Sequence, residues 1–277
     1  MFERLARSWS LVKASASVLQ ADKELMLFPA LSAVALLCVT AGFAVPMVLT
    51  LNPDSQAAGP LHFVVGFLFY LVSYFVIFFC NSALVGASLI RLRGGDPTVS
   101  DGFRIAFGKV GTIFGYALIA ATVGMVLRAI QERAGLIGRI IVGLMGIAWS
   151  LASFLVVPVL VTEEVGPIDA VKRSTLLLKK TWGEQFVGNF SIGSISGLAI
   201  FGVFLVTIPL AIVVGSTGSI PLLVTVIALG VFSVMAISLI SATLTGIYTA
   251  AVYRYAAEGE VGFGFSNEQV EGAFRPK

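Results

Sequence analysis

The chain has 277 residues, of which 57% are hydrophobic and only 12% are charged, and its formal net charge is +3 at pH 7. Soluble domains carry about 25% charged residues. The composition therefore excludes an ordinary soluble globular domain and predicts a membrane protein, for which we expect no nucleic-acid partner.

Six stretches of the chain are long and apolar enough to cross a bilayer, which takes about 20 residues of helix. They are Leu25–Leu51, Leu61–Ile90, Val110–Leu127, Ile140–Val161, Phe186–Val214 and Ile220–Tyr253. The first is far longer than the apolar part of a signal peptide, so we expect it to stay in place. The sequence predicts an all-α, polytopic bundle of six transmembrane helices.

The distribution of basic residues predicts the orientation. With both termini on one face, that face holds 15 of the 18 lysines and arginines, which indicates the cytoplasmic side of an inner membrane. Arg128, Arg133 and Arg139 are the exception. We interpret residues 128–139 as an amphipathic helix at the outer interface, with Arg128 paired to Glu132; a five-span or re-entrant arrangement is the alternative.

The segment "EEVGPIDAVKRSTLLLKKTWGEQ" (163–185) predicts an amphipathic helix that begins near Pro167. One face repeats at helical spacing: Ile168, Val171, Thr175, Leu178 and Trp182. Similar spacing occurs near the N-terminus and over residues 99–110. We therefore interpret residues 1–255 as one transmembrane domain of possible repeat units 1–93, 94–162 and 163–255, each a basic helix followed by a hairpin, with a cytoplasmic tail at 256–277.

The basic residues of these helices are the candidate contacts for anionic lipid headgroups of the cytoplasmic leaflet or for a partner protein: Arg104, Lys109, Lys172, Arg173, Lys179 and Lys180. A Lys or Arg near an anionic surface contributes about 1 kcal/mol to membrane binding. The alternative is that these residues only set topology.

Residues typical of catalysis are scarce. His62 is the single histidine, so we expect no metal, no cofactor and no histidine-based catalytic site. A membrane-embedded enzyme of lipid metabolism would need Glu163, Glu164 or Asp169 clustered beside Lys172 or Arg173 in a pocket. We expect the protein not to be an enzyme.

Uncharged polar residues inside the spans favour hydrogen bonds between helices or, less often, a polar path for a solute. They are Asn81, Asn189, Ser191, Ser194, Ser196, Ser233, Ser238, Ser241, Thr243 and Thr245. Small residues four apart, Gly111 with Gly115 and Gly193 with Gly197, predict close helix packing, either within the chain or in a homo-oligomer. Pro46, Pro158 and Pro209 predict kinks or helix ends.

The residues "RSWSLVKASASVLQADKELMLFP" (7–29) and "EEVGPIDAVKRSTLLLKKTWGE" (163–184), with the ending "AFRPK", resemble an uncharacterised bacterial and archaeal family of six-span membrane proteins. The E-x-x-G-P-x-x-A-x-x-R-S portion is loosely similar to the membrane-anchor domains of some glycerophosphodiester phosphodiesterases. That second resemblance implies a helical scaffold beside lipid chemistry, without a catalytic motif that this chain could share.

Two functions follow as expectations. The first is a non-enzymatic membrane scaffold or assembly protein whose basic face contacts anionic lipids or a partner membrane protein. The second is a transporter or permease for an apolar or lipid-like solute. A water-lined cavity that reaches mid-membrane past Asn81 or Asn189 would favour the transporter, and a tightly packed bundle would favour the scaffold.

Overall fold

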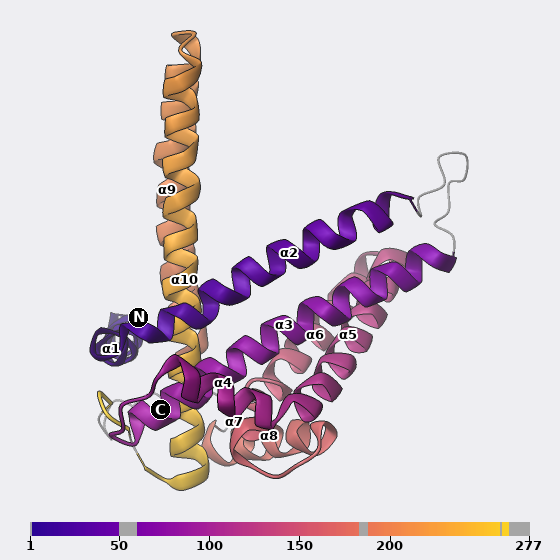
Figure 1. Ribbon diagram of the computed structural model, residues 1–277, viewed down its shortest axis with the longest axis vertical. Coiled ribbons are helices and arrows are strands. Elements are labelled where there is room, and N and C mark those ends of the chain that lie inside the picture. Colours follow the sequence, from indigo (N-terminus) through magenta and orange to yellow (C-terminus); the bar gives the residue numbers. More distant parts are fainter. Residues whose placement is uncertain (1, 50–59, 183–187, 261, 266–277) are drawn as a thin grey trace.

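The computed structural model describes residues 2–49, 60–182, 188–260 and 262–265, with side chains placed for 12–49, 60–179, 192–260 and 262–265. The described residues contain helices and no strand (Figure 1). The helices are α1 (Phe2–Ala21), η1 (Lys23–Met26), α2 (Leu27–Leu49), α3 (Pro60–Leu92), α4 (Val99–Gly108), α5 (Val110–Arg133), α6 (Leu136–Ala152), α7 (Val156–Thr162), α8 (Pro167–Trp182), α9 (Gly188–Ser216) and α10 (Ile220–Glu258).

The predicted all-α bundle with six membrane spans is confirmed. The apolar helical segments run over Lys23–Leu49, Pro60–Leu92, Val110–Arg133, Leu136–Thr162, Ile192–Ser216 and Ile220–Glu258. The molecule is therefore a multi-pass membrane protein. Short helices α1, α4 and α8 precede the hairpins α2–α3, α5–α6 and α9–α10 in chain order. This order matches the proposed repeat units, whose boundaries stay a prediction.

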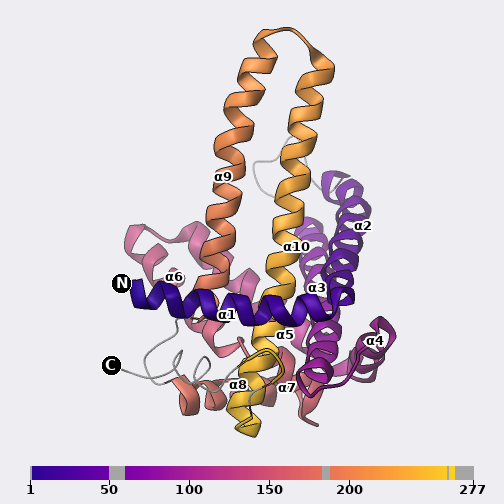
Figure 2. The same ribbon diagram turned by 90° about the vertical axis from the view of Figure 1, so that its left-hand side faces the viewer.

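The short helices gather at one end of the molecule, which we call the basal end (Figure 1). Helix α4 begins with a capping box, in which the Asp101 N–H donates to Thr98 Oγ1 at 3.2 Å and the Thr98 N–H donates to Asp101 Oδ2 at 3.0 Å. Helix α1 lies crosswise over the basal part of α9 and α10 (Figure 2).

The fourth span is broken between α6 and α7. Pro158 has no N–H, so it cannot hydrogen-bond the Phe154 carbonyl four residues earlier. At the break, the Leu155 N–H instead donates to Ser174 Oγ of α8 at 3.0 Å. The predicted effect of Pro158 is confirmed, whereas Pro46 and Pro209 lie inside α2 and α9.

The predicted interfacial helix over residues 128–139 is wrong. Helix α5 continues to Arg133 and α6 begins at Leu136, because Ala134 and Gly135 take extended backbone conformations and form the hairpin turn. The pairing within that segment is confirmed, since Arg128 Nε lies 2.9 Å from Glu132 Oε1.

The predicted apolar face of α8 is rotated from the face that packs. The buried residues are Ala170, Ser174 and Leu177, while Ile168 is 62% exposed. The buried face of α8 includes Ser174 because Ser174 Oγ accepts a hydrogen bond from the Leu155 N–H at the break between α6 and α7.

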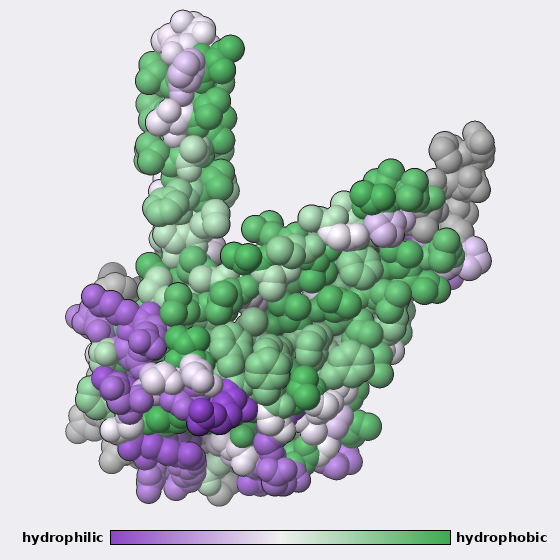
Figure 3. Space-filling view, viewed as in Figure 1, coloured by the Kyte–Doolittle hydropathy of each residue, from purple (hydrophilic) through white to green (hydrophobic). Residues whose placement is uncertain are grey.

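The hydrophobic core lies near the basal end. Residues 82–89 of α3 are all buried, and α3 packs with α4, α7 and α10, while α1 packs on α10 within the same core. By contrast, residues 198–240 of α9 and α10, which we call the arm, contain Gly230 as their one buried residue. The arm projects away from α2 and α3 (Figure 1), and the face seen in Figure 3 is mainly apolar below a more polar tip.

Candidate functional site

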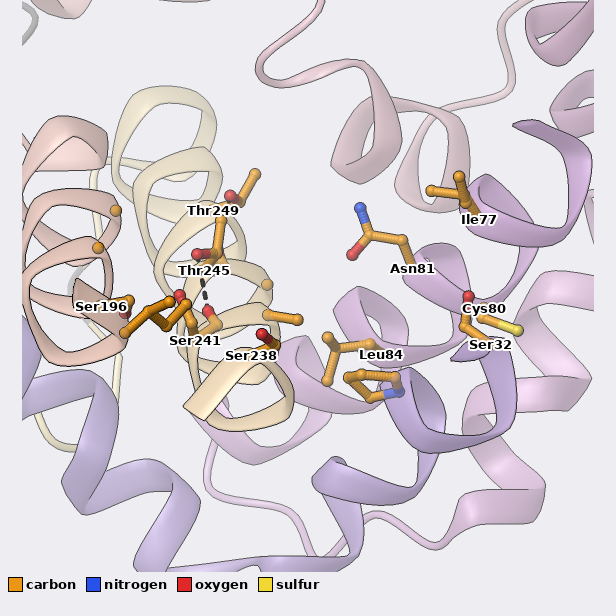
Figure 4. A pocket seen from close by; sticks show the side chains of 16 residues that line it. Ser32, Ile77, Cys80, Asn81, Leu84, Ser196, Ser238, Ser241, Thr245 and Thr249 are labelled. Carbon is orange, nitrogen blue, oxygen red and sulfur yellow. Dashed lines mark hydrogen bonds between the residues drawn. The ribbon is translucent and has the colours of Figure 1, made fainter. Parts of the chain in front are cut away.

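A cavity of about 570 Å³, which we call the central cavity, lies where the arm meets the bundle. Four helices line it, each with one stripe of residues (Figure 4). Helix α10 contributes Ser238, Ser241, Thr245 and Thr249, whose spacings of 3, 4 and 4 place them on one helical face. Every described residue in this lining is uncharged.

The other three helices contribute mainly small and apolar surface. Helix α3 provides Asn81 with Ile77, Cys80 and Leu84, and α2 provides Pro29 and Ser32. Helix α9 provides Gly193, Ser196, Gly197 and Ile200. The cavity is thus an apolar space with a stripe of hydroxyl and amide groups along one side.

A second cavity of about 670 Å³, which we call the far cavity, lies on the opposite side of the contact between α3 and α10. Asn81, Thr245 and Thr249 line both cavities. The far cavity extends between α5 and α6 to Arg128 and Gln131, near the end of α5 remote from the basal end. Three uncharged polar side chains therefore form the shared wall.

Close helix packing holds this wall in place. A Cβ atom on Gly246 would lie only 2.4 Å from Leu84 Cδ2, so the glycine allows α10 to touch α3. The same Cβ position is 3.6 Å from Asn81 Oδ1. The Asn81 amide points from α3 toward Thr245 and Thr249 (Figure 4), and it has no hydrogen-bond partner among the described residues.

The threonines of the wall offer acceptors to the cavities. The Thr245 hydroxyl donates to the Ser241 carbonyl at 2.8 Å, and the Thr249 hydroxyl donates to the Thr245 carbonyl at 2.7 Å. Their protons are used within the helix, while their oxygen lone pairs remain available. Asn81 supplies two amide donors and one acceptor beside them.

The structure brings together half of the polar residues singled out from the sequence. Asn81, Ser196, Ser238, Ser241 and Thr245 line the central cavity. Thr243 is buried and donates to the Leu239 carbonyl, and Ser233 donates to the Leu229 carbonyl on the arm. Ser194 is partly buried, and the side chains of Asn189 and Ser191 lie outside the described residues. Sequence analysis missed Ser32 and Thr249, although Thr249 follows Thr245 by one helical turn.

The four glycines predicted for helix packing differ in their surroundings. A Cβ on Gly115 would lie 3.0 Å from Pro167 at the start of α8, whereas a Cβ on Gly111, Gly193 or Gly197 would meet nothing within 4 Å. Those three glycines therefore make no close helix contact with the described residues, and their predicted role in packing stays a prediction. Gly193 and Gly197 instead widen the central cavity, and any contact between copies stays a prediction.

Two of the candidate headgroup residues join basal elements to one another. Lys109 Nζ lies 2.6 Å from Glu164 Oε1 and donates to the Glu163 carbonyl at 3.2 Å. Arg173 Nε donates to the Glu163 carboxylate at 3.1 Å, and the Tyr253 hydroxyl reaches the same carboxylate at 3.1 Å. These contacts tie α5, α8 and α10 to the end of α7.

The other candidate headgroup residues face outward. Arg104 and Lys172 are largely exposed and pair with Asp101 at 3.5 Å and Asp169 at 2.9 Å, and Lys179 is exposed. Exposed ion pairs of this kind contribute little energy, so these basic side chains can exchange their partners for lipid headgroups. The side chain of Lys180 lies outside the described residues.

A second network of hydrogen bonds and ion pairs at the basal end was not predicted from the sequence. Arg254 is almost buried; it donates to the Leu92 carbonyl and pairs with Glu260 at 2.7 Å and Glu258 at 3.3 Å. Arg91 donates to the carbonyl oxygens of Gly95 and Ala21. Burial raises the pKa of the nearby Asp22 carboxyl, while the Arg91 charge acts in the opposite direction. The only sequence signal was that Arg91 and Arg254 directly follow the second and the sixth predicted spans.

The fold and the cavities define the class of this molecule as an all-α, multi-pass membrane protein with two open cavities that share a wall of uncharged polar side chains. Residues 60–263 match a described family, and the chain belongs to it: the Family of unknown function (DUF6159). The match agrees with the resemblance to an uncharacterised six-span family and does not extend to glycerophosphodiester phosphodiesterase anchors. No curated protein matches the chain.

Proposed function

We propose that this protein binds a lipid-like solute in the central cavity and moves it through the membrane, as a transporter or permease rather than an enzyme. The observation that supports the proposal is the central cavity itself, which passes Asn81 among membrane-spanning helices. Ligand sites are typically apolar clefts of about 300–1,000 Å³ with a few polar groups. A tightly packed scaffold has no need of such a space.

The far cavity supplies the second half of a path. It shares Asn81, Thr245 and Thr249 with the central cavity and reaches toward Arg128. A polar group that follows this wall would exchange one set of hydrogen bonds for another, while its hydrocarbon part stays in apolar surroundings. Uncharged polar side chains lower the cost of moving such a group through the bilayer, where an unpaired polar group is expensive.

The proposal includes an orientation. The basal end carries α1, α4 and α8 with most of the basic residues, and Lys and Arg favour the cytoplasmic side. Both termini would then be cytoplasmic in an inner membrane. Exposed Arg104, Lys172 and Lys179 would contact anionic lipid at that surface.

The scaffold function is the second candidate, and the projecting arm favours it. Residues 198–240 expose apolar surface along two helices and bury Gly230 alone. Such a hairpin could contact a partner membrane protein or a second copy. Chemical crosslinking in the native membrane, with single cysteines on the arm, would reveal a stoichiometric neighbour if this function holds.

The transporter proposal is tested in vesicles that contain the purified protein and reporter lipids labelled on an acyl chain. A reductant that cannot cross the bilayer bleaches labels in the outer leaflet alone, so its kinetics report movement between leaflets. We expect faster movement of at least one reporter headgroup with wild-type protein, and slower movement with Gly193→Leu, which fills the central cavity. Unchanged kinetics for every headgroup, with protein verified as folded, would contradict the proposal.

A further inference from the structure

The lining of the central cavity indicates a ligand class more specific than a lipid. The far cavity also reaches Arg128, whose guanidinium group pairs with Glu132 at 2.9 Å. All described residues that line the central cavity are uncharged. A phosphate or ammonium group placed there would lose its hydration without gaining an opposite charge, which is costly in a medium of low polarity. The cavity therefore disfavours a charged headgroup.

The hydrogen-bonding groups of the wall favour hydroxyls. Thr245 and Thr249 use their protons within α10 and present acceptors. Asn81 presents both donors and an acceptor, and the described residues leave its amide unsatisfied. A hydroxyl group donates and accepts at the same atom, so it can satisfy both kinds of partner.

The cavity lining suits a ligand with several hydroxyl groups better than a ligand with one. Ser32, Ser196, Ser238 and Ser241 lie around the same cavity as the shared wall, so polar groups occur on several helices rather than at one point. The far cavity adds the aromatic rings of Tyr74, Tyr116 and Trp149. Flat aromatic faces suit the apolar face of a sugar ring, and Asn side chains suit its hydroxyls.

We propose that the shared wall of Asn81, Thr245 and Thr249 binds the uncharged, polyhydroxylated headgroup of a neutral glycolipid. The acyl chains lie in the apolar parts of the central cavity, beside Ile77, Leu84 and Ile200. This inference rests on the proposed function for its biological role, because it names the solute that the transporter carries. The binding itself can be measured without transport.

The experiment compares three lipids with identical dioleoylglycerol bodies: the monogalactosyl lipid, dioleoylglycerol with its single hydroxyl, and anionic dioleoylphosphatidylglycerol. The full chain is purified in a polyoxyethylene detergent, which carries no sugar, and each lipid is titrated during native mass spectrometry. We expect the monogalactosyl lipid to be retained about tenfold better than either of the others, as a few additional hydrogen bonds allow.

Two variants and one control test whether the shared wall is the binding site. Asn81→Leu keeps the size of the side chain and removes its hydrogen bonds, so we expect about a tenfold loss of monogalactosyl lipid. Thr249→Val serves the same purpose if Asn81→Leu does not fold. Thr225→Val is the matched control, because Thr225 lies on the same helix with the same type of hydrogen bond, to the Pro221 carbonyl, and outside both cavities.

Preference for the anionic lipid, equal retention of all three, or equal retention by wild type and the folded Asn81 or Thr249 variant would each overturn the inference. The vesicle assay separates the two proposals. Selective binding without movement between leaflets would support this site and contradict the transporter, whereas movement that is indifferent to Asn81→Leu and to the sugar would do the reverse.

Discussion

The two halves of α10 belong to one membrane-spanning helix and have opposite surroundings. Its outer half, within the arm, contacts α9 and buries Gly230 alone, whereas residues 246–254 are buried among α3, α7, α8 and α1. Apolar residues favour the membrane in both halves. Only the inner half is also held by protein, and only there do the glycines, polar stripes and charges form a site. Hydropathy therefore identifies a membrane span but does not reveal whether protein or lipid covers it.

Shortening one aromatic side chain in each half of α10 should give the largest difference in stability. Tyr248 is 1% exposed and Phe232 is 71% exposed on the same helix. We expect Tyr248→Ala to lower the free energy of unfolding by about 3–5 kcal/mol, as for buried aromatics, and Phe232→Ala to have almost no effect. Denaturant titration in micelles measures both.

Tyr248→Phe is the control for that experiment. The Tyr248 hydroxyl is buried without a hydrogen-bond partner among the described residues, so its removal should leave stability unchanged or raise it. Equal losses for Tyr248→Ala and Phe232→Ala would mean that the arm packs against something in its folded state.

The charged end of α10 gives the next largest effect. Arg254→Gln should cost about 1.5–3 kcal/mol, because Arg254 makes charge-assisted hydrogen bonds to the Leu92 carbonyl and to Glu260. Arg104→Gln, at a largely exposed pair, should cost little. The same unfolding titration compares them, and equal stability of both variants would show that the basal network does not hold α10 to α3.

Close helix contact at the basal end can be tested with one methyl group. A Cβ on Gly102 would lie 2.7 Å from the Ala83 carbonyl oxygen and 2.5 Å from Phe28 Cζ, while a Cβ on Gly108 of the same helix would meet nothing within 4 Å. Gly102→Ala should destabilise the protein by about 1–3 kcal/mol through overpacking. Gly108→Ala should be tolerated, and a tolerant Gly102 would contradict the packing of α4 on α3.

The exposed basic residues should affect lipid binding rather than stability. Joint replacement of Arg104, Lys172 and Lys179 by Gln should weaken retention of anionic lipid by about 1 kcal/mol for each residue in contact. Lys109→Gln should instead lower thermal stability, since its ammonium group bridges Glu163 and Glu164. Native mass spectrometry and thermal unfolding distinguish these results; unchanged lipid retention would leave the basic residues with a role in topology alone.

The smallest expected effect is on acid stability. The Thr98 side chain, then the Thr98 backbone N–H, donates to Asp101 and holds the pKa of that carboxyl below its usual range. The cap therefore contributes stability above the unfolded pKa and loses it as pH falls through the lowered folded pKa. Thr98→Ala should flatten this part of the pH dependence, measured as the unfolding midpoint from neutral pH to about pH 3. An unchanged profile would contradict the capping role.

The sequence predicted the elements better than their contacts. The six spans, the start of α8 near Pro167 and the Arg128–Glu132 pair follow from local composition and spacing, which act within a few residues. The buried face of α8 could not be predicted, because Ser174 turns inward toward a backbone break in a different helix.

The candidate site shows the same division. Asn81 and Thr245 stood out as polar residues in apolar helices, yet they lie 164 positions apart in the sequence. Their approach depends on the fit of Leu84 against Gly246, a packing relation that periodicity does not encode. From the sequence, Arg254 contributed only to the count of basic residues on the cytoplasmic face. Its neighbours in the sequence did not indicate that it would be buried and paired with Glu260, which follows α10.

The most direct test of the central claim is an experimental structure of the protein in lipid nanodiscs. We expect an arm that stands apart from α2 and α3, with elongated ligand density in the central cavity whose polar end meets Asn81. An arm packed along α2 and α3, with side chains filling the space between Asn81 and Ser238, would contradict it.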